Sequence, residues 1–171
     1  MIEPMIEPIF VILGILASVA IPRLAATRED AEISAAVANL RTLVSDAGAY
    51  YTVQGTFGSA GTAAKWNAIT NVSLVNAGGA AINAATTNAA VTAYLKVGGK
   101  SCIGVQLVNK GNNNNPPAHI KFTKNPTNQT TGVCGQVLNA PPVRAYIDST
   151  VPNGNGVIPG AIAISSNTKI Y

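Results

Sequence analysis

The chain has 171 residues and a mass of 17.4 kDa, which suits one compact domain with an appendage and is too short for two full domains. Hydrophobic residues make up 47% and charged residues only 11%, so the composition excludes a charge-driven disordered chain. The single histidine, His119, and the two cysteines are too few for a His- or Cys-rich metal site. No nucleophile motif lies near that histidine. We therefore expect a protein that is not an enzyme and holds neither a cofactor nor a metal ion.

Charge is unevenly distributed along the chain. Residues 1–50 carry six acids and three bases, whereas residues 51–171 carry eight bases and one acid, Asp148. The basic part is interpreted first as a solvated surface, with binding of nucleic acid or of an anionic surface as the alternative. The cations are scattered, and only Lys121 and Lys124 stand close together, so a dedicated nucleic-acid interface has little support.

The first predicted element begins with a charge-free run from Pro8 to Pro22. As a helix this run spans about 22 Å, which is short of a bilayer core of about 30 Å. Acidic residues precede the run, and a signal peptide would carry basic ones there. Residues 9–21 are apolar all round, which excludes a simple amphipathic core helix as well. The run therefore predicts a helix buried among similar helices, with residence in a bilayer left open as an earlier stage.

The helix is predicted to continue past Pro22 to about residue 53. Apolar residues recur there in steps of four and three, forming one helical stripe that consists of Ile33, Val37, Leu40, Val44, Ala47 and Tyr51. Arg28 and Glu32 stand four residues apart and can form an ion pair on another side of the helix. Since Pro22 removes a backbone hydrogen bond, we expect a kink or local melting near residues 18–22. Gly55 marks the end of the helix.

Beyond residue 54 the apolar pattern changes to period two, which predicts strands. The candidate strands are residues 91–97, 102–108, 118–123, 133–138 and 143–147, with 161–164 and 169–171 as further edge segments. Gly98 and Gly99 would form a turn, and residues 62–76 are ambiguous between a short helix and a loop. Alternation along the third candidate places Ile120 on the buried face and His119 on the solvent face.

These elements predict an α+β fold in which an antiparallel sheet packs on the amphipathic stripe of one long helix. The helix occupies residues 1–53, of which 1–24 protrude and 25–53 are amphipathic. Residues 54–171 form a globular, β-rich head. As a monomer in water, a helix of this length with an uncovered apolar end would leave a large apolar surface exposed, so we expect it to need partners.

The segment Gly-Ile-Leu-Ala-Ser-Val-Ala-Ile-Pro-Arg-Leu, residues 14–24, resembles the N-terminal segment of type IV pilins and of the related pseudopilins of type II secretion. The resemblance is specific over residues 9–24 and extends in pattern to about residue 53. It implies a pilin-like fold with the helix kinked at Gly14 and Pro22. It also implies a mature subunit cleaved from a short leader, with a methylated first residue. Such a subunit is anchored in the inner membrane until the pilus assembly machinery packs its helix into an extracellular helical filament.

The resemblance further implies an assembly salt bridge near the start of the chain. A carboxylate inside an apolar bundle is costly unless it is paired, and the free amine of a neighbouring N-terminus is the natural partner. Glu7 is the first candidate and Glu3 the second, with the amine of Met1 as the cation. The start departs from the family pattern, because Met-Ile-Glu-Pro occurs twice within residues 1–8. The alternative is that both glutamates face solvent and favour the dipole at a helix N-terminus.

Cys102 and Cys134 are the only two cysteines. In an extracellular protein an isolated pair most often forms a disulfide, which would stabilise the head by about 3–4 kcal/mol. Two buried free thiols are the alternative.

Three functions compete. The first is a structural subunit of a type IV pilus that serves adhesion, motility or DNA uptake. The second is a pseudopilin of a type II secretion system, but members of that family commonly hold calcium with acids near the C-terminal end. Here Asp148 is the only acid after residue 46, which counts against a calcium site. The third is a membrane-anchored module whose basic head binds DNA or a host surface.

Overall fold

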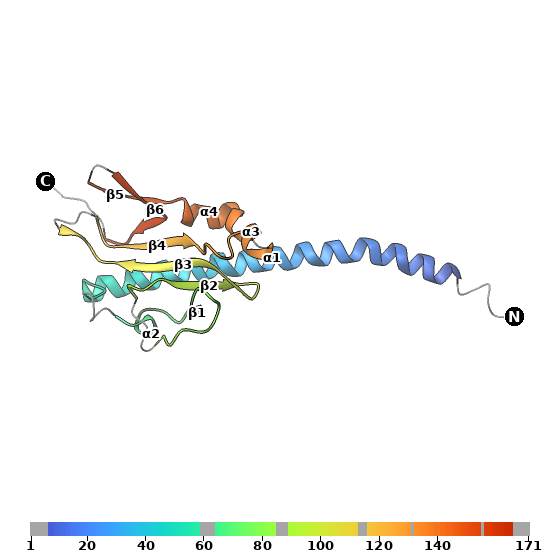
Figure 1. The fold of residues 1–171 in the computed structure, drawn as a ribbon, viewed down its shortest axis with the longest axis horizontal. Helices are drawn as coiled ribbons and strands as arrows, with labels where there is room; N and C mark the ends of the chain where they lie inside the picture. Colours follow the sequence, from blue (N-terminus) through green and yellow to red (C-terminus); the bar gives the residue numbers. More distant parts are fainter. Residues whose placement is uncertain are drawn as a thin grey trace.

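A computed structural model shows one long helix, α1 (Glu7–Gln54), whose C-terminal half carries a β-rich head (Figure 1). The structure describes residues 7–58, 64–84, 89–112, 116–130, 132–154 and 156–165, and of residues 7, 8 and 19–25 it describes the backbone only. The chain combines helices with an antiparallel sheet, which confirms the predicted α+β class.

Helix α1 is continuous over 48 residues. The backbone remains helical through Pro22, so the expected local melting near residues 18–22 is wrong. A proline removes one backbone hydrogen bond, and the hydrogen bonds of the neighbouring turns are enough to keep the helix intact. The kink expected at Gly14 and Pro22 stays a prediction. The helix ends as predicted, where Gly55 adopts a left-handed φ of +68° and donates its N–H to the Tyr51 carbonyl at 2.7 Å.

The head is built on a five-stranded antiparallel sheet in the order β1-β2-β3-β4-β7. Its strands are β1 (Leu74–Val75), β2 (Ala93–Val97), β3 (Lys100–Val108), β4 (His119–Lys124) and β7 (Ala161–Ala163). Gly98 and Gly99 form the β2–β3 turn with φ angles of +55° and +83°, which glycine adopts without a steric penalty. A separate hairpin, β5 (Thr150–Asn153) and β6 (Gly156–Pro159), was not predicted from the sequence.

The sheet confirms the strands predicted for residues 91–97, 102–108 and 118–123, and the edge segment at 161–164. The other edge candidate, residues 169–171, lies outside the described residues. The ambiguous segment around Trp66 contains a short helix, α2 (Trp66–Ile69), followed by strand β1.

Two predicted strands are wrong. Residues 133–138 belong to helix α3 (Gly132–Asn139), and residues 143–147 belong to helix α4 (Pro141–Ile147). In α3 the buried side chains Cys134, Val137 and Leu138 recur at helical spacing. In α4 the first two positions are prolines, which have no N–H for a sheet and favour the first turn of a helix.

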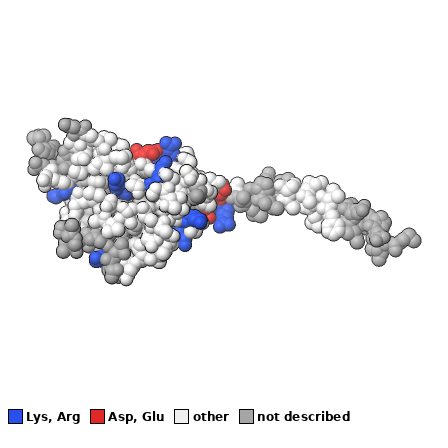
Figure 2. Space-filling view, viewed as in Figure 1, with Lys and Arg blue, Asp and Glu red and all other residues white. Residues whose placement is uncertain are grey.

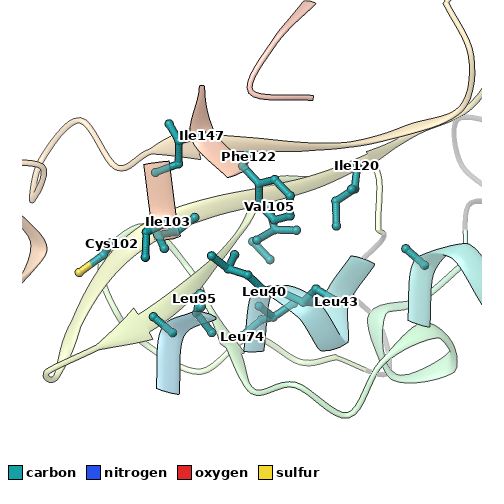
Figure 3. Close-up of a cluster of buried hydrophobic side chains, with 14 of the residues drawn as sticks. Leu40, Leu43, Leu74, Leu95, Cys102, Ile103, Val105, Ile120, Phe122 and Ile147 are labelled. Atoms are coloured by element: carbon teal, nitrogen blue, oxygen red, sulfur yellow. The ribbon is translucent and has the colours of Figure 1, made fainter. Parts of the chain in front are cut away.

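The core lies between α1 and one face of the sheet (Figure 3). The predicted stripe faces this core: Val37, Leu40, Ala47 and Tyr51 are buried, and Ile33 and Val44 pack against the core half-buried. Leu40 and Leu43 point toward side chains of the sheet that include Leu95, Val105 and Ile120 (Figure 3). Tyr51 packs on Phe57 with ring centroids 5.1 Å apart, and its burial raises the pKa of its hydroxyl.

His119 does not face solvent, as the alternation predicted, but is only 1% exposed. Its Nδ1 lies 2.8 Å from the Pro117 carbonyl oxygen. β4 is an interior strand, so Val108 of β3 and Ala163 of β7 flank His119 on both sides within the sheet. Alternation correctly predicted that His119 and Ile120 lie on opposite faces of the sheet. It did not show that both faces are covered at this end of β4.

Candidate assembly surface

The N-terminal half of α1 projects away from the head (Figure 1). Every described side chain from residue 9 to residue 18, here called the apolar helix segment, is exposed. Seven large apolar side chains in it keep 55–67% of their surface accessible: Ile9, Phe10, Val11, Ile12, Leu13, Ile15 and Leu16. These positions surround the helix, so the described part of the head covers no side of the segment.

This exposure is energetically unusual. Complete burial of one such side chain contributes about 1.5–3 kcal/mol. Burial of the whole segment against a partner would therefore contribute on the order of 10 kcal/mol of free energy. Soluble monomers rarely expose a contiguous apolar surface of this size unless it binds something. The segment is therefore the candidate functional site.

Two features are absent from the part of the chain that the structure describes. None of its helices reaches the length and apolarity needed to cross a membrane. Its His, Cys, Asp and Glu side chains form no cluster of three or more that could hold a metal ion.

Charged residues mark the place where α1 enters the head (Figure 2). Arg28 Nε lies 3.4 Å from Glu32 Oε1, which confirms the predicted pair. The second oxygen, Glu32 Oε2, is buried and has no hydrogen-bond partner among the described residues. It lies against the β2–β3 turn, where a Cβ at Gly98 would come within 2.6 Å of it. Gln136 Nε2 of α3 donates to Glu29 Oε1 at 2.9 Å. The contacts of Glu29 and Glu32 join the base of the head to α1 just beyond the protruding part.

Cys102 and Cys134 form a disulfide, as predicted, with Cα atoms 5.3 Å apart. The bond ties α3 to β3, and both cysteines are fully buried in the head. It lies in the core cluster, apart in sequence and in space from the apolar helix segment (Figure 1).

We expect this disulfide to stabilise the head without contributing to assembly. The Cys102→Ala, Cys134→Ala double variant should lose about 3–4 kcal/mol of unfolding free energy, because its unfolded chain is less constrained. Urea denaturation of variant and wild type, with and without reductant, measures this loss, and reduced wild type should match the variant. Alkylation of either cysteine in native, unreduced protein would contradict the bond.

The residues predicted to form the assembly salt bridge stand at the start of the chain. Met1 and Glu3 lie outside the described residues, and of Glu7 the structure gives only its helical backbone at the start of α1. The pairing therefore stays a prediction. Pro22 likewise has a helical backbone, while its side chain lies outside the description.

The structure also reveals a groove that the sequence did not predict. It lies where α1 meets α4 and has a volume of about 310 Å³. Its lining consists of Ile33, Ser34, Val37, Ala38, Arg41 and Pro142. Residues 33–41 could have been assigned to one helix face, but Pro142 is brought beside them by the packing of α4, for which the sequence carries no local signal.

Lys and Arg side chains are scattered over the face of the head seen in Figure 2 and form no continuous patch there. Lys121 and Lys124, the closest pair in sequence, lie on one strand, β4, and point to opposite faces of it. This arrangement gives no additional support to a nucleic-acid interface.

Comparison with family models, curated proteins and solved structures finds no match for this chain. The class of the protein is therefore described from its structure alone. It is an α+β protein in which a head with its own core carries an exposed, all-round apolar helix.

Proposed function

We propose that this protein is the structural subunit of an extracellular type IV pilus, polymerising through its apolar N-terminal helix. The observation that supports the proposal is the apolar helix segment, which is exposed on all sides beside a head that has its own hydrophobic core. The assembled filament would serve adhesion, motility or DNA uptake.

An apolar rod needs partners on every side, and the described part of its own head supplies none. Further copies of the chain carry the same segment, so parallel copies can bury one another's segments in a common bundle. A contact that joins different surfaces of two copies repeats without closing and generates a filament. The kink at Gly14 and Pro22, the membrane-anchored state before assembly and the role of the assembly machinery belong to this proposal.

The alternative functions have less support. A pseudopilin with a calcium site would need a cluster of acids in the head, but Asp148 is the only acid after residue 46 and pairs with Arg144 at 2.9 Å. Binding of DNA or of a host surface draws on the basic composition of the head, whose cations are scattered. Electron microscopy of purified native material separates these functions: long uniform filaments support the pilus subunit, and dispersed monomers in detergent contradict it.

One charge in the apolar helix segment should prevent assembly. Leu16→Asp would place a carboxylate in the apolar bundle, where burial without a partner costs several kcal/mol. Val53→Asp is the matched control, because Val53 is 80% exposed near the other end of the same helix. We expect no filaments from Leu16→Asp and normal filaments from Val53→Asp, as measured by sedimentation and electron microscopy after detergent removal. Normal filaments from Leu16→Asp would contradict the proposed role of the segment.

A further inference from the structure

A small polar pocket lies at the base of the head. It has a volume of about 220 Å³ and is lined by three segments that are far apart in the sequence: residues 77–79, 99–101 and 127–128. The second segment follows Gly98, which lies against Glu32 of α1, so the pocket is close to the place where α1 enters the head. Its volume is below the roughly 300–1,000 Å³ of sites for drug-sized ligands, and it suits a small ion or a single chemical group.

Buried polar side chains hold these three segments together. Ser101 is 1% exposed and Asn125 is fully buried, and they are two of the four polar residues that are buried in the described part of the chain. Ser101 Oγ donates to the Ala77 carbonyl at 2.5 Å and accepts a hydrogen bond from Asn125 Nδ2 at 2.8 Å. It accepts a second one from Asn128 Nδ2 at 3.0 Å. Because buried polar groups are costly unless they are bonded, this network holds the wall of the pocket in one arrangement.

The lining of the pocket offers hydrogen-bond donors and positive charge. Among the described residues that form it, Lys100 is the only charged one, and there is no acid. Lys100 is exposed, and the described part of the chain places no carboxylate within ion-pair distance of its ammonium group. Thr127 adds a hydroxyl, and the glycines at positions 78, 79 and 99 leave backbone rather than side chains at the wall. Ammonium, hydroxyl and backbone N–H groups are the donors that bind oxyanions in proteins.

We infer that this pocket binds a small oxyanion such as a phosphate group, with Lys100 as its counter-charge and the Thr127 hydroxyl as a further donor. The inference goes beyond the proposed function and does not depend on it. The charge of the surroundings agrees, because residues 51–171 carry eight bases and one acid. Glu32, the acid beside the β2–β3 turn, lies outside the lining, and one of its oxygens is paired with Arg28. Free phosphate and the phosphodiester of a lipid headgroup share this chemistry.

Phosphorus NMR of the full chain in micelles of an uncharged detergent tests the inference. Inorganic phosphate is titrated at constant ionic strength, and its resonance should shift and broaden in a saturable way with the wild type. Lys100→Gln should weaken the affinity roughly tenfold, because it removes a charge-assisted hydrogen bond, and Thr127→Val should weaken it by a smaller factor. Lys96→Gln is the matched control, since Lys96 is an exposed lysine of β2 that does not line this pocket.

A second titration separates the two sources of the phosphate group. Its probe is glycerophosphoglycerol, a soluble phosphodiester with the chemistry of an anionic lipid headgroup. Tighter binding of the diester than of inorganic phosphate would assign the pocket to a headgroup, and the reverse order would assign it to free phosphate.

Two results would overturn the inference. The first is the absence of saturable binding by the wild type. The second is equal affinity in the wild type, Lys96→Gln and Lys100→Gln, which would mean an adventitious ion only. The thermal transition of Lys100→Gln should match that of the wild type, so that a loss of binding is not a loss of fold. If Lys100→Gln does not fold, Thr127→Val decides, and an unchanged phosphate affinity in that variant overturns the inference.

Discussion

Deletion of residues 1–24 should turn this protein into a soluble, folded monomer. The buried residues of the core begin at Ala36, and Glu29 of α1 accepts a hydrogen bond from Gln136 of the head. The truncation therefore removes the exposed apolar helix segment and leaves the core, the sheet and the disulfide in place. Light scattering should give the mass of one chain, and circular dichroism should show a cooperative thermal transition.

A control shows that this assay detects loss of the head. Leu40 is fully buried on α1, so Leu40→Ala in the truncated chain should lower the unfolding free energy by about 2–5 kcal/mol. If the truncated protein were unfolded, the head would depend on residues 1–24 for its stability. If it still polymerised, the assembly surface would lie in the head. Either result would contradict the division into an assembly helix and a self-sufficient head.

Replacement of Glu7 by alanine should abolish filaments or reduce them sharply. In the proposed filament the Glu7 carboxylate pairs with the N-terminal amine of an adjacent subunit inside an apolar bundle. Loss of one partner of a buried pair costs about 3–5 kcal/mol, because the other charge remains buried and unpaired. Glu3→Ala should have a smaller effect. Filament yield measured by sedimentation gives the ranking, and the thermal transition of the head should not change.

Asp30→Ala is the matched control for Glu7→Ala. Asp30 is an exposed acid on the same helix at the edge of the head, so its loss removes one negative charge without touching the N-terminal bundle. Filaments should form normally from it. Normal filaments from the Glu3→Ala, Glu7→Ala double variant would refute the assembly salt bridge and favour two solvent-facing acids at a helix N-terminus.

Periodicity and glycine positions were enough to predict the long helix and the central strands. The stripe from Ile33 to Tyr51 predicted which face of α1 the head covers, because a helix buries residues three and four apart. Alternation bounded by Gly98 and Gly99 predicted the β2–β3 hairpin, since two consecutive glycines accept the turn that this pairing needs. The absence of charge from residue 9 to residue 21 predicted an apolar helix that the head leaves uncovered, and the described side chains of residues 9–18 agree.

The remaining features depended on packing between segments far apart in the sequence. Residues 133–138 and 143–147 alternate like strands, but they fold as α3 and α4, where one face of each helix is buried against the core. Segments of five or six residues are too short to separate the two periods, and the partner that covers a segment selects one of them. The burial of His119 likewise depends on segments distant in the sequence, since β3 and β7 flank it on the two sides of β4. The groove at Val37 and Pro142 exists only because α4 packs against α1 across about a hundred residues of chain, a contact that no local pattern encodes.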